Sequence, residues 1–390
     1  MNRIKQVRQV AWHERDSCDV LIYDEEGSDL ISRCLPRNLA VQILHVRKGL
    51  PLIKSFRFFL LLLSNISKYG ITRESLITSM IQIWKPKIVI TNIDNSPALA
   101  GLNAKFPKLQ CISVQNGSRW DLSNPNVHPI RFGQYFTFGT VEKEILASSY
   151  CTAEQIHPIG SLRAGIFTEE HELVKVSTYD LCFISGYTPL KSSYVDAWDE
   201  AITNAYHQVE KMLFELVAFY ALSNHLSLCI AMRYSKEDLE HVDEKRYFSF
   251  PNTASGTSFH FIPRSGYSSY EAATASRLCI TSSSSLGYEV LGLGKKVLFA
   301  KDVRDLAQLV FQGSWNENYV TKYLPPLLRL HSLEPKEFSA KVKQILNMPD
   351  EKYAEYTKEA RLKYMNLDLE NLPQQIIQQE IANIINKLNY

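Results

Sequence analysis

The chain has 390 residues, of which 45% are hydrophobic and 22% are charged, and its formal net charge is +2. This composition is ordinary for a folded protein and excludes an intrinsically disordered one, while the near-neutral charge gives no general attraction to nucleic acid. The length exceeds that of a typical single domain and predicts two domains.

The cysteines and the N-terminal residues bear on the cellular compartment. The seven cysteines are scattered and include no Cys-x-x-Cys pair, so we expect buried thiols of a reducing compartment, with neither a zinc site nor a disulfide framework. Residues 1–16 are too polar for a signal peptide. The longest strongly apolar run, residues 58–63, is far shorter than the roughly 20 residues that cross a bilayer. We therefore expect a cytoplasmic protein.

Short apolar runs alternate with helical patterns in the first half of the chain. The runs that predict strands are residues 18–23, 41–46, 87–91, 109–114 and 132–138. The helical patterns are residues 28–36, 53–67, 72–84 and 141–149. Near-continuous apolar strands that alternate with helices predict an α/β domain, residues 1–165, whose parallel sheet is covered on both faces.

The helix expected at residues 53–67 allows two interpretations. It carries three phenylalanines and four leucines, with Lys54, Arg57 and Lys68 at its edges. The favoured interpretation is a buried helix that covers the sheet. The alternative is a helix that rests on anionic lipid with its aromatic face, which would give the protein a peripheral association with the inner membrane.

Polar clusters follow three of these strands. They are the acidic turn 24–27 after the first strand, residues 92–97 after the third, and residues 115–119 after the fourth. In open α/β sheets ligands bind at the carboxyl ends of the strands. The residues of these clusters are therefore candidate site residues. The alternatives are that Asp94 only caps a turn and that residues 24–27 are only a solvated surface turn.

The second half repeats the pattern after a predicted linker, residues 166–178. Its expected strands are residues 179–185, 226–232, 259–263, 278–281 and 296–300, and its expected helices are residues 194–224, 268–275 and 286–293. A second α/β domain is therefore expected at residues 179–345, and both domains would be doubly wound. Residues 346–390 are predicted to be helical, either packed on the second domain or crossing back to the first.

The stretch 277–300 predicts one strand–loop–helix–strand unit with four serines in the loop. Unpaired N–H groups and the positive end of the helix dipole at such a loop suit a phosphate, and Ser283, Ser284 and Ser285 would add hydroxyl donors. Glu289, further along the helix, would accept hydrogen bonds from a ribose. The alternative is that these residues only cap the helix.

The sequence Ser-Ser-Ser-Leu-Gly-Tyr-Glu at residues 283–289, followed by Gly-Lys-Lys-Val, resembles the nucleotide-binding stretch of GT-B glycosyltransferases that build bacterial surface polysaccharides. It is most similar to the surface carbohydrate biosynthesis group and to the Kdo transferases of capsule and lipopolysaccharide. Ser284-Ser285 stands where that pattern has Ser-Thr, and Val290 where it has Ala. The step at residues 159–163 also resembles the one that closes the first domain of these enzymes.

The resemblance implies two Rossmann-like domains facing across a cleft and a transferase that needs neither cofactor nor metal ion. It also implies a nucleotide-sugar donor, best matched by a CMP-ulosonic acid such as CMP-Kdo, and a glycan or lipid-linked glycan acceptor. Donor binding is expected from Arg233, Ser283, Ser284, Ser285, Gly287 and Glu289. A surface ion pair with Glu237 is the alternative for Arg233.

The resemblance further places the acceptor or sugar near Gln115, Asn116, Arg119 and Arg163, and either arginine would neutralise the carboxylate of an ulosonate. Gln115 and Asn116 replace the acidic residues of the Kdo transferases, so the catalytic carboxylate is expected at Asp94, Glu26 or Glu25. Other hypotheses are a UDP- or GDP-sugar transferase, a nucleotide-sugar epimerase of the same fold, and a non-catalytic subunit of polysaccharide assembly.

Overall fold

The computed structural model of the 390-residue chain forms two units of similar size. The first contains residues 1–166 and 368–390, and the second contains residues 167–367. The residues that the structure describes are 17–46, 55–94, 102, 105–119, 130–172, 176–189, 200–249, 259–282, 284–300, 323–330 and 332–389.

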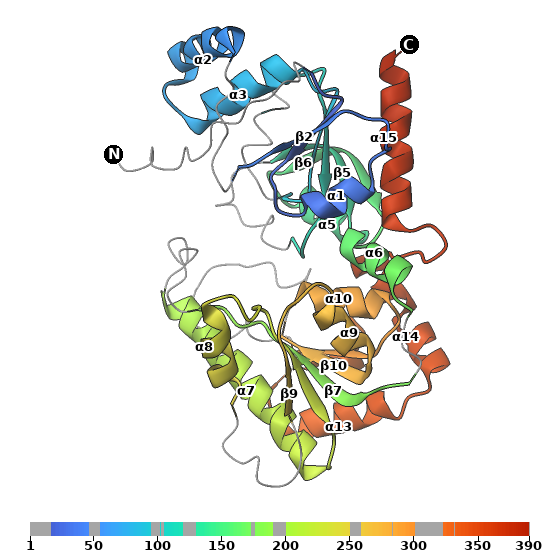
Figure 1. Ribbon diagram of the computed structural model, residues 1–390. Coiled ribbons are helices and arrows are strands. Elements are labelled where there is room, and N and C mark those ends of the chain that lie inside the picture. Colours follow the sequence, from blue (N-terminus) through green and yellow to red (C-terminus); the bar gives the residue numbers. More distant parts are fainter. Residues whose placement is uncertain are drawn as a thin grey trace. The chain divides into compact units, whose positions relative to one another are not determined.

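The first unit is built on a six-stranded parallel sheet with the strand order β2-β1-β3-β4-β5-β6 (Figure 1). Its strands are β1 (Val20–Tyr23), β2 (Val41–Leu44), β3 (Ile88–Thr91), β4 (Gln110–Val114), β5 (Arg131–Thr137) and β6 (Thr152–Pro158). The residues of β1 and β3 are buried throughout, as expected for central strands of a sheet covered on both faces.

The helices of this unit are α1 (Ser28–Arg33), α2 (Phe56–Tyr69), α3 (Arg73–Trp84), α5 (Val141–Ala147), the start of α6 (Leu162–Glu170), and α15 (Pro373–Asn389). The hydroxyl of Thr72 caps α3 by accepting a hydrogen bond from the N–H of Ser75 at 3.2 Å. The C-terminal helix α15 contacts this unit through Gln134, whose amide donates to Glu380 at 3.1 Å. Residues more than 200 positions apart in sequence therefore belong to one unit.

The strand order of the first sheet reverses between β1 and β3. The chain runs from β1 to β2 on one side and resumes at β3 on the other, so the loops that follow β1 and β3 diverge from a common point. Gly27 after β1 has a φ of 76°, and a β-carbon there would lie 2.5 Å from the side-chain nitrogen of Asn92 after β3. Such a switch point is where open α/β sheets bind ligands.

The second unit repeats this plan with the strand order β12-β11-β10-β7-β8-β9, again all parallel. Its strands are β7 (Tyr179–Ile184), β8 (Leu228–Ala231), β9 (Phe259–Ile262), β10 (Ser276–Thr281), β11 (Val297–Ala300) and β12 (Arg329–Leu330). The order reverses between β7 and β10. A β-carbon on Gly186 after β7 would lie 3.0 Å from the hydroxyl oxygen of Ser282 after β10, so the two loops are neighbours.

The helices of the second unit are α7 (Glu200–Ser223), α8 (Glu240–Tyr247), α9 (Ser268–Thr274), α10 (Ser285–Gly292), η4 (Pro326–Leu328), α13 (Pro335–Leu346) and α14 (Asp350–Tyr364). Tyr353 of α14 accepts a hydrogen bond from the N–H of Val297 at 3.0 Å, and Arg361 donates to the carbonyl of Gly292 at 3.0 Å. These bonds attach α14 to α10 and β11, so the second unit extends beyond the boundary at residue 345 that the sequence predicted.

Two expectations need correction. Residues 166–178 are not wholly a linker, because α6 continues to Glu170 and its residues Ile166 and Phe167 are buried. The side chains of Ile166 and Phe167 pack in the protein interior. The sequence did not predict a helix here, because the apolar residues of this stretch show only weak helical periodicity. The helix at residues 53–67 does not simply cover the sheet, because α2 leaves much of its apolar surface exposed. Among the described helices, none is long and apolar enough to span a bilayer.

Candidate functional site

The four serines at residues 282–285 connect β10 to α10, and we call this segment the serine turn. It lies at the carboxyl end of β10, at the start of α10. Ser284 is the N-cap residue in an extended conformation, but its hydroxyl makes no capping hydrogen bond. The turn is held instead by the N–H of Ser284, which donates to the hydroxyl of Thr281 at 3.2 Å. Ser284 and Ser285 are half-buried, while Ser283 lies outside the described residues. Ser284 therefore does not cap α10 with its side chain, which was the alternative role for these serines.

Gly287 and Glu289 lie on α10 behind this turn. A β-carbon on Gly287 would lie 2.6 Å from the Thr281 methyl group and 3.1 Å from the ring of Phe299. Glycine here lets α10 pack closely on the sheet, and the expected donor contact of Gly287 stays a prediction. Glu289 is 6% exposed.

Glu210 on α7 joins the two loops of the switch point. Its carboxylate accepts a hydrogen bond from the N–H of Gly186 at 2.7 Å and another from the hydroxyl of Ser282. Burial raises the pKa of Glu210, although these two hydrogen bonds oppose the rise. A single side chain therefore positions the loop after β7 and the start of the serine turn.

Arg233 follows β8 and is also held by a buried carboxylate. Glu244 on α8 is fully buried and accepts hydrogen bonds from the N–H groups of Arg233 at 2.8 Å and Tyr234 at 3.0 Å, and from the hydroxyl of Ser185. Burial raises the pKa of Glu244. This network fixes the backbone from which the exposed Arg233 side chain extends.

The guanidinium of Arg233 lies over the loop after β7. It donates to the carbonyl of Tyr187 at 3.1 Å and to the hydroxyl of Thr188 at 2.9 Å. Among the described residues it forms no ion pair with Glu237, which was the alternative for this arginine. A permanently charged group thus lies at the same sheet edge as the serine turn, two strand positions from β10.

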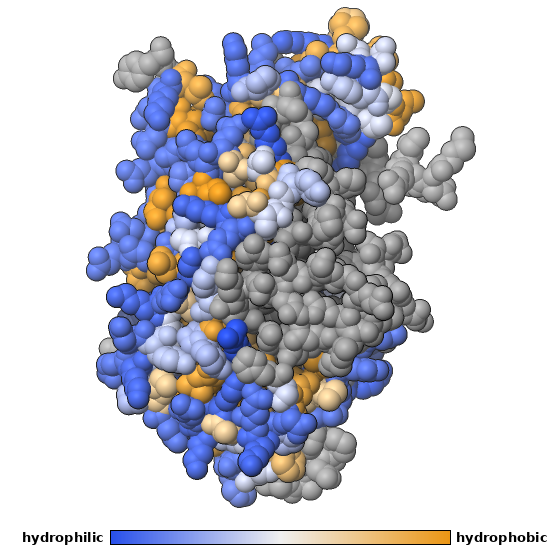
Figure 2. Space-filling view, turned by 180° about the vertical axis from the view of Figure 1, so that it is seen from behind, coloured by the Kyte–Doolittle hydropathy of each residue, from blue (hydrophilic) through white to orange (hydrophobic). Residues whose placement is uncertain are grey.

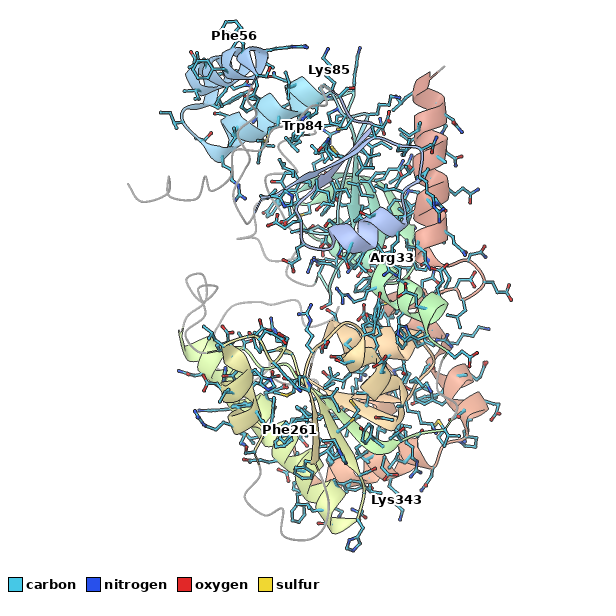
Figure 3. The ribbon with its side chains drawn as sticks, in the orientation of Figure 1. Arg33, Phe56, Trp84, Lys85, Phe261 and Lys343 are labelled. Atoms are coloured by element: carbon cyan, nitrogen blue, oxygen red, sulfur yellow. The ribbon has the colours of Figure 1, made fainter. Side chains whose placement is uncertain are left out.

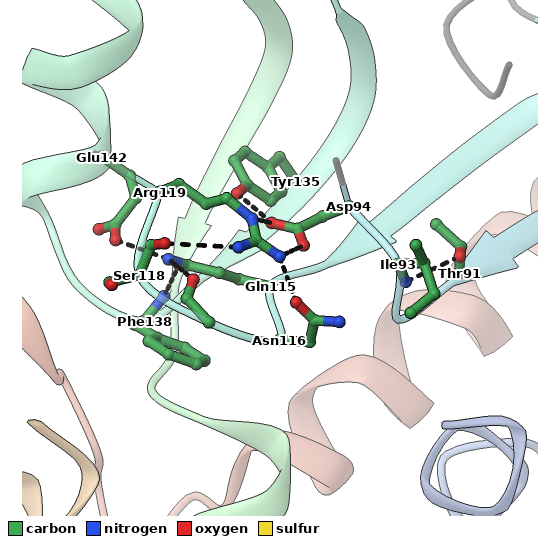
Figure 4. A network of polar contacts seen from close by, with 11 residues as sticks. Thr91, Ile93, Asp94, Gln115, Asn116, Ser118, Arg119, Tyr135, Phe138 and Glu142 are labelled. Carbon is green, nitrogen blue, oxygen red and sulfur yellow. Dashed lines mark hydrogen bonds and ion pairs between the residues drawn. The ribbon is translucent and has the colours of Figure 1, made fainter. Parts of the chain in front are cut away.

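In the first unit Asp94 and Arg119 form a buried ion pair (Figure 4). The guanidinium donates to both carboxylate oxygens of Asp94, with one distance of 2.8 Å, and to the side chain of Asn116. The hydroxyl of Tyr135 donates to Asp94 at 2.7 Å, and its pKa is raised well above the usual value because the residue is buried. The expectations that Asp94 acts as a base and that Arg119 binds a ligand carboxylate are disfavoured, since each neutralises the other.

Gln115 lies in a second part of the same network. Its amide nitrogen donates to Glu142 at 2.8 Å, and its oxygen accepts from the N–H of Phe138 at 2.6 Å. Glu142 on α5 also accepts from the N–H of Gly139 at 3.3 Å. Burial raises the pKa of Glu142 to about 7. Gln115 is 2% exposed, so its observed role is to hold the ends of β4 and β5 together.

The remaining candidates of the first unit are more accessible. Glu25 is half-buried and Glu26 is exposed, and both lie in the turn after β1, beside the switch point. Arg163 is half-buried near the start of α6, which follows the edge strand β6. Since β6 is three strands from β3, roughly 14 Å away, the structure does not bring Arg163 together with Asp94.

Four residues of these networks were not expected from the sequence: Tyr135, Glu142, Glu210 and Glu244. Glu210 had a detectable signal, because residues 210, 213, 214 and 217 have the spacing of a buried helical stripe and the other three are apolar. A glutamate on such a stripe must find partners inside the protein. The other three had no comparable signal.

Taken by itself, each switch point has a defined chemistry. The second unit offers an anion a helix N-terminus, serine hydroxyls and an arginine, while the first offers carboxylates in the turn after β1. Within the described ranges, no group of three or more His, Cys, Asp and Glu side chains is placed to hold a metal ion.

Solved structures with a similar fold cover nearly the whole chain. They include UDP-GlcNAc 2-epimerase from Neisseria meningitidis bound to UDP-GlcNAc, with 13% identity, a TM-score of 0.51, and 94% of this chain and 99% of that chain covered. The S. aureus MnaA–UDP structure has 12% identity, a TM-score of 0.52 and coverages of 95% and 96%. The wall teichoic acid polymerase TagF with CDPG has 11% identity, a TM-score of 0.51 and coverages of 95% and 90%.

At these identities the similarity shows the fold alone, and it confirms the predicted GT-B fold with two Rossmann-like domains. No curated protein matches the chain. A family model described as "putative O-antigen biosynthesis protein" matches residues 128–380, which is more than half of the sequence. The chain therefore belongs to this O-antigen biosynthesis family.

Proposed function

We propose that the protein is a glycosyltransferase that moves a sugar from a nucleotide-activated donor to a surface polysaccharide or a lipid-linked glycan. The observation that carries the proposal is the serine turn of α10, which lies at the switch point of the second sheet beside Gly186. Membership in an O-antigen biosynthesis family and the GT-B fold support the same conclusion.

In this proposal the turn binds the phosphates of the donor. The first N–H groups of α10 and the hydroxyls of Ser284 and Ser285 would donate to phosphate oxygens, with Ser283 as a further donor. Arg233 would add a full positive charge as the phosphate leaves. Glu289 would hold the ribose. Because these groups supply the electrostatic stabilisation, no metal ion is required, and excess EDTA should leave the rate unchanged.

The proposed base that accepts the proton of the acceptor hydroxyl is Glu26 or Glu25. Both lie beside the switch point of the first sheet, and both are more accessible than Asp94, which is 1% exposed and paired with Arg119. The Asp94 carboxylate already accepts hydrogen bonds from Arg119 and Tyr135, so its oxygens are less available to an acceptor hydroxyl. In this proposal Asp94, Arg119, Gln115 and Asn116 shape the loops that receive the acceptor.

The test is a thermal-shift panel of CMP, UDP, GDP and ADP with the full chain and a Ser284→Ala/Ser285→Ala variant. A ligand that binds only the native state at 100 times its Kd adds about 2.7 kcal/mol to the free energy of unfolding. We expect one nucleotide to raise the Tm of the wild type and to raise that of the variant less. If no nucleotide shifts the wild type, the proposal fails.

The matching sugar donors then identify the substrate. CMP-Kdo is the donor expected from the sequence, and UDP-GlcNAc and GDP-sugars are the alternatives. Release of free nucleotide that requires a glycan acceptor would support transfer.

A nucleotide-sugar epimerase is the second candidate, favoured by similarity to the UDP-GlcNAc 2-epimerase and MnaA–UDP structures. Incubating the donor without an acceptor separates the two, because only an epimerase would isomerise the sugar. Nucleotide binding with neither isomerisation nor transfer would instead indicate a non-catalytic assembly subunit.

A further inference from the structure

Helix α2 exposes an apolar stripe to solvent. The side chains of Phe56, Phe59, Leu60 and Leu63 are 78%, 55%, 51% and 48% exposed. Residues spaced by three, four and seven lie on one side of a helix, so the four form a continuous stripe. Figure 3 shows Phe56 projecting outward from α2, and Figure 2 shows apolar side chains gathered over this helix at the top right.

The opposite side of α2 is fixed by polar contacts. Phe58 is buried in the core of the first unit. The amide of Asn65 donates to Ser79 at 2.9 Å and to Gln82 at 2.8 Å, both on α3. If α2 rotated to bury its apolar stripe, the Asn65 amide would lose these partners, which is costly for a buried polar group. The stripe is therefore a fixed part of the surface.

The charged side chains in and directly after α2 have one sign. Residues 55–73 contain no Asp or Glu, but they contain Arg57, Lys68 and Arg73, all of which are exposed. Ile71, just beyond the end of α2, is 81% exposed and adds to the apolar surface. The nearest acidic residue in sequence, Glu74, is paired with Lys105. The surface is thus apolar with a basic border.

We propose that this surface docks the protein on a membrane that contains anionic lipid. The four stripe residues enter the boundary between headgroups and acyl chains, while Arg57, Lys68 and Arg73 contact lipid phosphates. A second copy of the chain is a poor occupant, because it would bring like charges together. A projecting helix also needs no complementary groove in a bilayer, whereas a protein partner must provide one.

The proposal goes beyond donor binding, because it involves only the first unit. It would bring the enzyme to the surface where lipid-linked acceptors are found. It also revises the favoured interpretation of the sequence at residues 53–67, since the apolar side chains of α2 outnumber those that the sheet and α3 can cover.

The experiment is flotation of the full chain with vesicles of phosphatidylcholine containing 0–40% phosphatidylglycerol. We expect binding that increases with phosphatidylglycerol and decreases with salt. A Phe56→Ser/Phe59→Ser variant should bind at least about tenfold more weakly, as should Arg57→Gln/Lys68→Gln at low salt. All four side chains are exposed, so both variants should fold.

Matched controls distinguish this surface from general stickiness. Phe219→Ser removes an aromatic side chain that is 61% exposed in the second unit, and Lys352→Gln/Lys358→Gln removes two exposed cations there. Both should bind vesicles like the wild type. Equal loss in the controls, or no wild-type binding at any lipid composition, would overturn the proposal. So would a dimer that the α2 substitutions dissociate. The Tm shifts that nucleotides induce, measured in parallel, should be the same in the α2 variants as in the wild type. A loss of membrane binding can therefore be distinguished from a failure of the donor site.

Discussion

The buried carboxylate of Glu210 accepts a hydrogen bond of 2.7 Å from the backbone N–H of Gly186 and a second from the hydroxyl of Ser282. Gly186 follows β7 and Ser282 follows β10, and these strands flank the switch point of the second sheet. One side chain from α7 therefore connects both loops of the proposed donor site.

Replacing Glu210 by alanine should loosen both loops. Gly186 and Ser282 would each lose an acceptor, at about 1–3 kcal/mol per donor, so we expect a free energy of unfolding lower by about 2–6 kcal/mol and nucleotide binding weakened by about tenfold. Urea denaturation and calorimetric titration measure the two effects. Glu215→Ala is the matched control, because Glu215 is on the same helix, half-exposed and 4.0 Å from Lys211. Equal effects in the two variants would contradict the positioning role.

The Asp94–Arg119 pair should be strongly coupled. Arg119→Met leaves the buried Asp94 carboxylate with the hydrogen bond from the Tyr135 hydroxyl but without its cation, and breaking such a pair typically costs about 3–5 kcal/mol. Asp94→Asn combined with Arg119→Met should cost less than the sum of the single substitutions, which a double-mutant cycle in urea measures. Additive effects would show that the pair is not coupled.

An exposed ion pair in the same unit provides the control for that cycle. Arg131 lies 3.3 Å from Glu154, and both side chains are more than 60% exposed. Arg131→Met should lower the free energy of unfolding by less than about 1 kcal/mol, because solvent screens such pairs. A cost as large as that of Arg119→Met would mean that burial is not the reason for the difference.

Glu142 should make stability depend on pH. Burial raises the pKa of its carboxyl to about 7 in the folded protein, so the folded state binds a proton more tightly than the unfolded state. The protonated carboxyl of Glu142 therefore stabilises the folded state fully below about pH 4.5. As pH rises towards 7, this contribution is lost and the free energy of unfolding falls by roughly 1–3 kcal/mol. Glu142→Gln cannot titrate, so its free energy of unfolding should fall less over this range. A slope identical to that of the wild type would exclude Glu142 as its source.

The seven thiols should be unreactive in the native protein. All seven are buried and unpaired with one another in disulfides, and burial raises the pKa of Cys18 and Cys111 to about 12. Because the thiolate is the reactive form, we expect DTNB to titrate fewer than about one thiol in native protein and all seven in urea. Rapid reaction of several native thiols would contradict this burial.

Much of the fold follows from local patterns. The apolar runs placed β1, β3, β4 and β5 and the strands around the serine turn within a few residues, because central parallel strands must be apolar on both faces, and they also placed the edge strand β2, which is mostly apolar. The strand β6 was not predicted, since it lies at an edge and is mostly polar. The predicted linker at residues 166–178 begins inside α6, which is continuous across the boundary between the two units at residue 166.

The sequence alone determined the α/β class, the doubly wound parallel plan and the polar loops at strand ends, since each of these depends on the order of neighbouring residues. Only the tertiary structure decided which of those loops meet and what their side chains do. Asp94 and Arg119 are 25 positions apart, and their mutual neutralisation depends on β3 and β4 pairing. The tertiary structure likewise decided that Glu210 binds Gly186 and that the apolar stripe of α2 faces outward. The reason is that burial is a property of the packed chain and not of any short stretch of it.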